Sequence, residues 1–406
     1  MGVGTQAECP AGLGPFVVVE YVDHARTVSE ALNILGRSDD ERPLLDPKID
    51  EGVHEFLYGH MAQILLKLSR PSLPRIGSFS EVDEFEWAET ERPVTYNANN
   101  VVLLGGVLPD RLPSGTFSTA SSYYSALADL HLEHLSAHHN DAVQDEHDCR
   151  GEYIARQLFR NLAAEKRLDT FPEYEHGPFK LYCEDLRPEC VLLTESNTVA
   201  GVVDWEFTIS APASFAYSPP WWLLIERPTG WPWKLDKWEK EYVPRLHTFL
   251  DILKRQEDEA IAAGRMTDAE RLSNRMRRIW DSGGFWIDYA AQYSFAFDHI
   301  YFNRLDERFF GNAEGDWLEC RLPLLSEEQR QNMEAFVRMK IAQKDDRRMK
   351  DGRFEGLLPE EAILQKCDDA NVTEPLLTKE QRQGMEAFVQ MQMVQKDGKR
   401  MKRREI

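Results

Sequence analysis

Two short apolar segments in the middle of the chain constrain the fold more than any other feature. Residues 191–193 (VLL) and 199–203 (VAGVV) are separated by a polar turn, which is the pattern of a β-hairpin. Asp185 lies shortly before the first segment, and Asp204 follows the second. Pairing of the two strands would bring both carboxylates to the same end of the hairpin. A base carboxylate and a metal-binding carboxylate placed in this way suit phosphoryl transfer.

Helical periodicity dominates the rest of the sequence. Apolar residues recur at helical spacing in the ranges 53–68, 118–136, 145–167, 238–262, 268–280 and 285–302. A buried strand is predicted over residues 16–22 (FVVVEYV), after a glycine-rich start, residues 1–14, that is predicted to be irregular. We therefore expect a mainly α (α+β) fold, with helices around one short β-hairpin.

The C-terminal part contains an internal repeat. Residues 323–351 match residues 375–403 at 19 of 29 positions, with an offset of 52. Each copy opens with a capping box and continues with apolar residues at helical spacing. Two copies are too few for a solenoid. We therefore predict a helical tail over residues 323–406 with a duplicated segment, whose helices are a candidate surface for a protein partner.

Charge and composition exclude several classes of partner. The net charge of −21 disfavours binding to nucleic acid or to an anionic membrane. Apolar runs of the length of a membrane span and the features of a secretory signal are missing from the sequence. The six cysteines include no CxxC pair, which is typical of free thiols in a reducing compartment. These features predict a soluble, cytoplasmic protein that has no nucleic-acid or membrane partner.

The central segment resembles the catalytic region of the aminoglycoside phosphotransferase family, especially its fungal branch, which has a protein-kinase-like fold. Residues 183–190 (CEDLRPEC) are similar to the catalytic loop, and residues 203–206 (VDWE) are similar to the metal-binding segment. The segments GPFVVVEYVDH, APASFAYSPPWWLLIERP and FWIDYAAQYSFAFDHIYF are also similar, so the resemblance covers roughly residues 14–337. It implies a kinase-like C-terminal lobe over residues 23–322.

The resemblance implies ATP- and Mg²⁺-dependent transfer of the γ-phosphoryl group to a hydroxyl of a small molecule. Asp185 would be the catalytic residue that orients or deprotonates the hydroxyl, and Asp204 would bind Mg²⁺. The hinge that reads adenine through its backbone would be formed by Glu20, Tyr21 and Val22. The substrate cleft would be lined by Trp205, Glu206, Trp221 and Trp222. The alternatives are a loop cap for Asp185 and ordinary packing for the tryptophans.

Two features depart from the family pattern. Cys190 stands where the family has its second metal ligand, an Asn, and a thiol is a poor ligand for the hard Mg²⁺ ion. The hinge-like strand begins at residue 16, so that residues 1–22 are only a remnant of the N-terminal lobe, either because the gene model is truncated or because the protein is a C-terminal-lobe remnant. We therefore expect impaired transfer. The alternative is a catalytically inactive pseudoenzyme that acts as a binding or scaffold protein.

Three histidines at helical spacing are also candidate zinc ligands: His131, His134 and His138. Neighbouring cysteines or carboxylates at matching spacing do not complete a site. We therefore predict that these histidines form a partly exposed polar face of a helix.

Overall fold

The computed structural model describes residues 2–4, 16–18, 21–36, 43–84, 86–139, 143–230 and 235–348. The chain divides into two compact units, residues 1–23 with 353–406 and residues 24–352. In the first unit, β1 (Gly2–Gly4) pairs antiparallel with β2 (Phe16–Val18). The other elements given below belong to the second unit.

The N-terminal strand is shorter than the sequence predicts. The described strand β2 covers Phe16–Val18, and Tyr21 and Val22 of the predicted range are not in a strand. The prediction that residues 1–14 are irregular is also wrong for residues 2–4, which form β1. Tyr21 and Val22, two of the proposed hinge residues, lie beyond the strand, and Glu20 lies outside the described residues.

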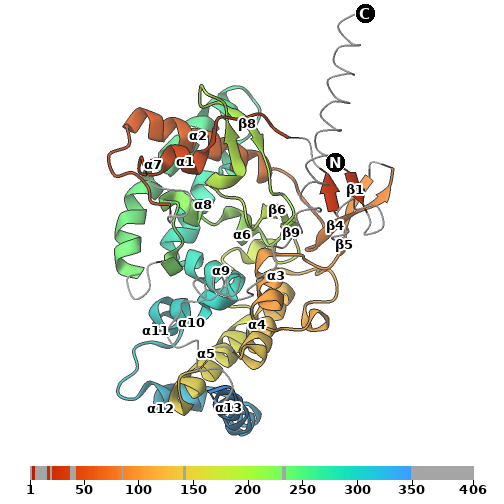
Figure 1. The fold of residues 1–406 in the computed structure, drawn as a ribbon, viewed down its shortest axis with the longest axis vertical. Helices are drawn as coiled ribbons and strands as arrows, with labels where there is room; N and C mark the ends of the chain where they lie inside the picture. The colour runs from red at the N-terminus through yellow and green to blue at the C-terminus, as the bar shows by residue number, and fades with distance from the viewer. Residues whose placement is uncertain are drawn as a thin grey trace, which may run out of the picture. The chain divides into compact units, whose positions relative to one another are not determined.

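The second unit is built mainly from helices (Figure 1). Helices make up 59% of the structure and strands 12%, which confirms the mainly α class. The helices are α1 (Val28–Leu32), α2 (Glu51–Leu68), α3 (Tyr96–Leu103), α4 (Ala120–Ala137), α5 (Glu146–Ala164), α6 (Ala213–Tyr217), α7 (Leu235–Ala262), α8 (Leu272–Asp281), α9 (Gly284–Gln292), α10 (Phe297–Ile300), α11 (Asp306–Phe310), α12 (Trp317–Arg321) and α13 (Glu327–Arg348).

In the described part of the second unit, the strands form three small antiparallel sheets. One sheet has the order β3 (Arg26–Thr27), β7 (Val191–Leu193) and β8 (Val199–Val202). The other two are the pairs β4 (Ser78–Asp83) with β5 (Glu86–Glu91) and β6 (Lys180–Cys183) with β9 (Thr208–Ala211). The predicted central hairpin is confirmed as β7–β8, with Val191 opposite Val202.

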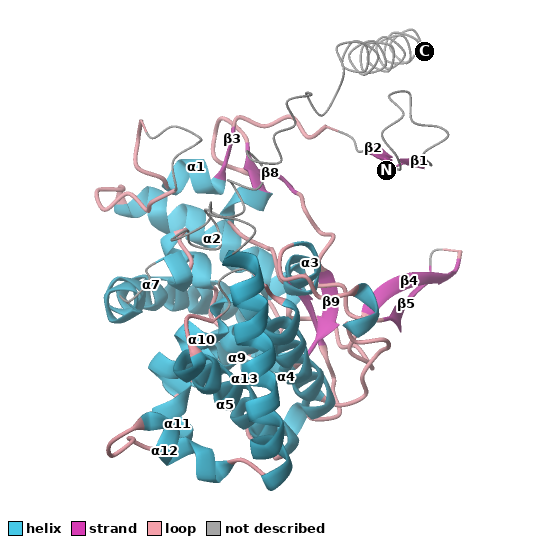
Figure 2. Cartoon of the chain, turned by 60° about the horizontal axis from the view of Figure 1, so that its bottom comes forward, coloured by secondary structure: helices cyan, strands magenta, loops and turns pink. Residues whose placement is uncertain are grey.

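The prediction of a single hairpin is wrong, because β4 and β5 form a second one (Figure 2). Its sequence, SFSEVD followed by EWAETE, is rich in Glu and Asp, which are depleted in strands. Most of these acidic side chains are exposed, whereas Glu89 is buried. Because this hairpin contains few aromatic and β-branched residues, its composition does not predict two strands.

Helices α2 and α7 pack together and hold the segment that carries two of the predicted cleft tryptophans. The Asp50 side chain caps α2 by accepting a hydrogen bond from the Val53 N–H at 3.0 Å. The rings of Tyr58 on α2 and Phe249 on α7 lie 5.8 Å apart. The Tyr58 hydroxyl donates to the Leu223 carbonyl oxygen. This contact ties the segment around residues 221–225 to α2.

The helix predicted over residues 285–302 is interrupted. Helix α9 ends at Gln292, and the Ser294 N–H donates to the Asn97 side-chain oxygen at 2.9 Å, while the Asn97 amide donates to the Ser294 hydroxyl at 3.1 Å. These contacts with α3 compete with a continuous helix. A π-helical turn, Tyr301–Leu305, follows α10, and Asp306 then forms a buried ion pair with Arg321.

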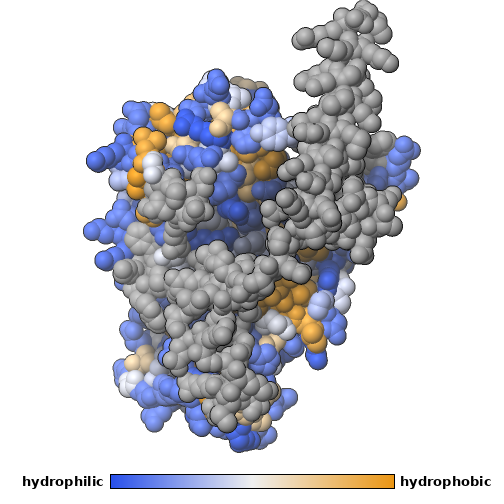
Figure 3. Space-filling model, viewed as in Figure 1, coloured by the Kyte–Doolittle hydropathy of each residue, from blue (hydrophilic) through white to orange (hydrophobic). Residues whose placement is uncertain are grey.

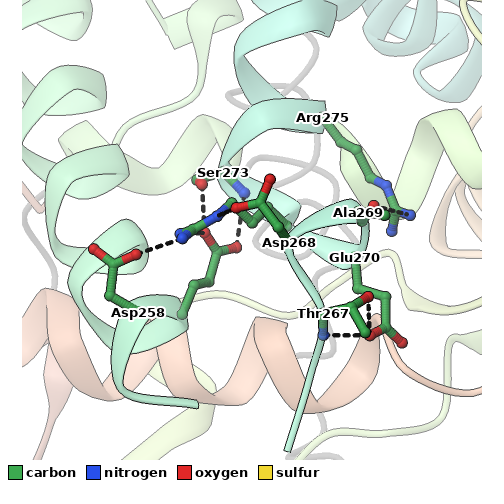
Figure 4. Close-up of polar contacts among 9 residues, drawn as sticks. Asp258, Thr267, Asp268, Ala269, Glu270, Ser273 and Arg275 are labelled. Atoms are coloured by element: carbon green, nitrogen blue, oxygen red, sulfur yellow. Dashed lines mark hydrogen bonds and ion pairs between the residues drawn. The ribbon is translucent and has the colours of Figure 1, made fainter. Parts of the chain in front are cut away.

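A polar cluster joins the end of α7 to the start of α8 (Figure 4). The fully buried Glu257 carboxylate accepts hydrogen bonds from the Ser273 N–H, at 2.9 Å, and from the Ser273 hydroxyl. It therefore satisfies an amide near the N-terminus of α8. Arg271 donates to Asp268 at 2.6 Å and also pairs with Asp258. The Arg271 guanidinium therefore connects Asp258 on α7 with Asp268 in the segment before α8.

The visible surface of the described residues is largely hydrophilic, with scattered apolar patches (Figure 3). Trp87, on the β4–β5 hairpin, is 61% exposed, but single exposed apolar side chains are normal on protein surfaces. Within the described ranges, no helix combines the length and the apolar character needed to cross a membrane.

Candidate active site

Asp185 lies in the loop between β6 and β7 and is nearly buried, with 7% of the residue exposed. Its carboxylate forms an ion pair with Arg187 and lies 3.7 Å from the Arg227 guanidinium. Arg187 precedes a 3-10 turn, Pro188–Cys190, whose proline suits the first helical position. Two cations therefore surround the carboxylate that the sequence assigns to catalysis.

Arg227 is held in place by aromatic rings. Its guanidinium carbon lies 4.4 Å from the ring centre of Trp221, 4.9 Å from that of Tyr293 and 5.5 Å from that of Tyr96. Contacts of this kind favour a cation over an aromatic face. Arg227 was not among the predicted site residues, although it belongs to the segment APASFAYSPPWWLLIERP that resembles the family.

Cys190 is fully buried, and its thiol donates to the backbone carbonyl of Asp185 at 3.3 Å. Burial raises the pKa of this thiol to about 12, so that it stays protonated at neutral pH. Because the thiolate is the form that binds metals, the buried thiol does not fit the role of a Mg²⁺ ligand.

Two hydrogen bonds join the Asp185 loop to the Asp204 loop. The Val203 N–H donates to the Cys190 carbonyl at 2.9 Å, and the Cys183 thiol contacts the Asp204 carbonyl at 3.8 Å. The Cys190 thiol, by contrast, bonds within its own loop, to the Asp185 carbonyl. Burial also raises the pKa of the Cys183 thiol. The two cysteines therefore hold the backbone of both carboxylate-bearing loops together.

Asp204 differs from Asp185 in both exposure and backbone conformation. It is exposed, and its φ of +62° lies in the left-handed region, which Asp tolerates better than most residues other than Gly. Trp205, 39% exposed, donates its indole N–H to the Val202 carbonyl at 3.0 Å, and Glu206 is exposed. These three residues form a solvent-facing corner after β8.

A donor set for Mg²⁺ is not assembled by these residues. Among the residues that the structure describes, no group of three or more His, Cys, Asp or Glu side chains could hold a metal ion. The Asp204 carboxylate is the oxygen type that Mg²⁺ prefers, but the Cys190 thiol is not. Asp204 therefore suits the ion, whereas Cys190, the degenerate position, does not.

A cavity of about 70 Å³ lies next to the Asp185 loop. It has room for a few water molecules but is well below the roughly 300–1,000 Å³ of typical ligand pockets. Trp221 and Trp222 line it, whereas Trp205 and Glu206 do not. Trp222 is 2% exposed and packs edge-on against the Phe249 ring at 5.9 Å. The four predicted cleft residues are therefore split between a buried wall and an exposed corner.

Two buried carboxyl groups on the cavity wall were missed by sequence reasoning. Glu184 accepts a weak hydrogen bond from the Asn97 N–H at 3.4 Å, near the N-terminus of α3, and burial raises its pKa to about 7. Asp288 accepts from the Tyr124 hydroxyl at 2.6 Å, and burial raises its pKa to about 8. The second oxygen of Asp288 has no hydrogen-bond partner among the described residues. The sequence signal for this buried carboxyl cluster is limited to the position of Glu184 next to Asp185.

The predicted partly exposed histidine face is wrong for His131 and His134, whereas His138 is half-buried. His131 is 1% exposed and His134 is 4% exposed, because both pack under the α9–α10 connection. The His131 ring lies 3.0 Å from the Ser294 hydroxyl, and burial lowers its pKa to about 3. These are neutral core histidines at physiological pH.

Comparison with known proteins leaves the family resemblance as a prediction. No family model, curated protein or solved structure matches this chain.

Proposed function

We propose that this chain is a phosphotransferase-related protein in which ATP- and Mg²⁺-dependent transfer to a hydroxyl of a small molecule is impaired. The observation that supports the phosphotransferase part is the pair of hydrogen bonds that join the Asp185 and Asp204 loops. They keep a buried carboxylate and an exposed carboxylate on neighbouring loops, as a base and a charge-binding group require. Asp185 would accept the proton of the substrate hydroxyl.

The impairment rests on the immediate surroundings of each carboxylate. A hydroxyl that approaches Asp185 must compete with Arg187 for the same carboxylate oxygen. Asp204 has no second oxygen ligand at position 190, where the buried thiol stays protonated. Transfer that depends on both groups is therefore expected to be slow.

The second candidate function is a binding or scaffold protein without catalysis. The ion pairs of Asp185 with Arg187 and Arg227 favour it, because they satisfy this carboxylate without a substrate. The same pairs are compatible with a slow enzyme if a substrate displaces Arg187. Nucleotide binding therefore separates the two candidates better than turnover does.

Calorimetry with ATP in the presence and absence of Mg²⁺ tests the phosphotransferase part. Saturable binding that requires Mg²⁺ supports it, and no binding at millimolar ATP favours the scaffold function. A panel of small hydroxyl compounds with labelled ATP then tests the impairment. Fast turnover that disappears in Asp185→Asn but persists in the exposed control Glu195→Gln, in the β7–β8 turn, would contradict it.

Cys190→Asn tests the role of the degenerate position. If Asn restores an oxygen ligand, the affinity for Mg·ATP should rise by about tenfold or more, the scale of changes around metal sites. The matched control is Cys183→Ser, which alters the other buried thiol of the same loops. Equal affinities in all three chains, with each shown to be folded, would mean that position 190 does not limit binding.

A further inference from the structure

The first copy of the repeat forms α13, which packs along α5 (Figures 1 and 2). We use "α13 seat" for the surface made by four side chains of α5 and the last carbonyls of α4. The four side chains are Arg150, Tyr153, Gln157 and Asn161. At the start of α13, the Gln329 amide donates to Gln157 and to Asn161, each at 2.9 Å. The Tyr153 hydroxyl donates to the Gln329 carbonyl at 3.2 Å.

The middle of α13 provides the apolar and ionic contacts. Met333 is 5% exposed and Val337 is 1% exposed, so both side chains are buried in the seat. The Phe336 ring lies 5.2 Å from the ring of Tyr153. Glu334 forms a two-pronged ion pair with Arg150, with both N–O distances at 2.9 Å. Together these side chains define which sequence can occupy the seat.

Lys340 closes the contact at the end of α4. Its ammonium group donates to the His138 carbonyl at 2.7 Å and to the Ser136 carbonyl at 3.4 Å. Carbonyls at a helix C-terminus lack partners within the helix, and a cation there is favoured by the helix dipole. Lys340 is therefore the charged anchor of α13.

The second copy repeats the residues that make these contacts. Its residues at the positions of Gln329, Met333, Glu334, Phe336 and Val337 are Gln381, Met385, Glu386, Phe388 and Val389. Between Ser326 and Lys344 the copies differ at seven positions, and five of these are exposed in α13: Ser326, Glu327, Asn332, Arg338 and Ala342. Most of the differences between the two copies therefore lie at positions that do not contact the seat.

The main exception is at Lys340, where the second copy has Gln392. A neutral amide makes a weaker hydrogen bond to the carbonyls of α4 than an ammonium group does. We propose that the α13 seat also binds residues 375–403 of this chain, as a weaker competitor of α13. Two segments of the chain therefore fit the α13 seat, and the Lys340 contact makes α13 the tighter binder of the two.

Non-additive substitutions in the full chain test this exchange. Met333→Asp with Val337→Asp places charges on the buried face of α13, and Met385→Asp with Val389→Asp does the same in the second copy. The second pair alone should leave the unfolding temperature unchanged. All four together should lower it by about 5 °C more than the sum of the two pairs, because no competent occupant remains.

The matched control is Gln383→Asp with Gln390→Asp, which charges the positions equivalent to exposed Gln331 and Arg338. In combination with the α13 pair, this control should show no extra loss. Additive unfolding temperatures for the four-substitution chain would overturn the proposal.

Photo-cross-linking provides a second measurement that does not require the destabilised chains. A benzophenone amino acid replaces Phe388 in a chain that carries only Lys340→Gln, which weakens α13 in its seat. Cross-links to α5 within one molecule are expected, with none from the same group at position 390. Absence of the cross-link from position 388 would overturn the proposal, as would cross-links found only at twice the mass of the chain, which would assign the seat to a second molecule.

Discussion

The Asp185 loop and the Asp204 loop carry the same functional group in opposite environments. Asp185 is nearly buried, is paired with arginines and follows a buried glutamate. Asp204 is exposed and holds a left-handed backbone conformation. The comparison teaches that a motif with two carboxylates does not imply two equivalent ligands. One loop is a folded network whose charge is already neutralised, and the other is an exposed corner that a partner could reach.

The largest expected difference between the loops is in their response to pH. Burial raises the pKa of Glu184, in the Asp185 loop, from 4.5 to about 7. Between pH 4.5 and about pH 7, the Glu184 carboxyl group is protonated in the folded protein but ionised in the unfolded chain. This contribution to stability is therefore fully present below pH 4.5 and is lost as the pH rises through about 7.

The Gln side chain of the Glu184→Gln variant does not titrate, so the free energy of unfolding of this variant should fall less as the pH rises. Between pH 5 and pH 8 the natural chain should lose up to about 3 kcal/mol more than the variant, as measured by urea unfolding. Glu206→Gln, on the exposed loop, should keep the natural pH dependence. Parallel curves for Glu184→Gln and the natural chain would show that Glu184 is not buried as described.

The second expected difference concerns the aspartates themselves. Asp185→Asn removes the charge that faces two guanidinium groups, and we expect a loss of about 1–2 kcal/mol in the free energy of unfolding. Asp204→Asn changes an exposed side chain and should stay within about 0.5 kcal/mol. Urea unfolding at constant pH and salt measures both. A loss at Asp204 that equals the loss at Asp185 would remove the contrast between the two loops.

The smallest expected effect is a gain of stability at the exposed corner. Gly adopts positive φ without the steric penalty of a Cβ atom, so Asp204→Gly should stabilise the chain by about 0.5–1 kcal/mol. Asn197 provides the control, since its φ of +61° is similar but its side chain accepts a hydrogen bond from Arg26 at 2.7 Å. Asn197→Gly should therefore gain less or lose stability in the same thermal unfolding measurement. Equal gains at both positions would show that the Arg26 contact contributes nothing.

Local patterns predicted much of the framework. The β7–β8 hairpin and the helices near residues 53–68 and 118–136 lie where periodicity placed them, because their caps and apolar faces are encoded within each segment. The break after α9 was not predictable in this way. It depends on Asn97, which is nearly 200 positions away in the sequence, and periodicity contains no information about such a contact.

The candidate site was predicted less completely than the framework. Asp185 and Asp204 could be singled out because each flanks a strand of the hairpin. Burial of Glu184 and Asp288, and the aromatic surroundings of Arg227, arise only when α3, α9 and the loop after β6 pack together. Sequence spacing also could not show that Trp222 faces the core whereas Trp205 faces solvent.

The π-helical turn Tyr301–Leu305 has a consequence for how this chain tolerates length changes. A π-helical turn holds one residue more than an α-helical turn, which shifts the angular phase of all following positions by about 100°. In this phase Tyr301 and Leu305 both face the core, and Asp306 meets Arg321. Removal of one residue from the turn would regularise the helix but rotate Asp306 away from its partner. The π-helical turn therefore sets the orientation in which Asp306 forms its ion pair with Arg321.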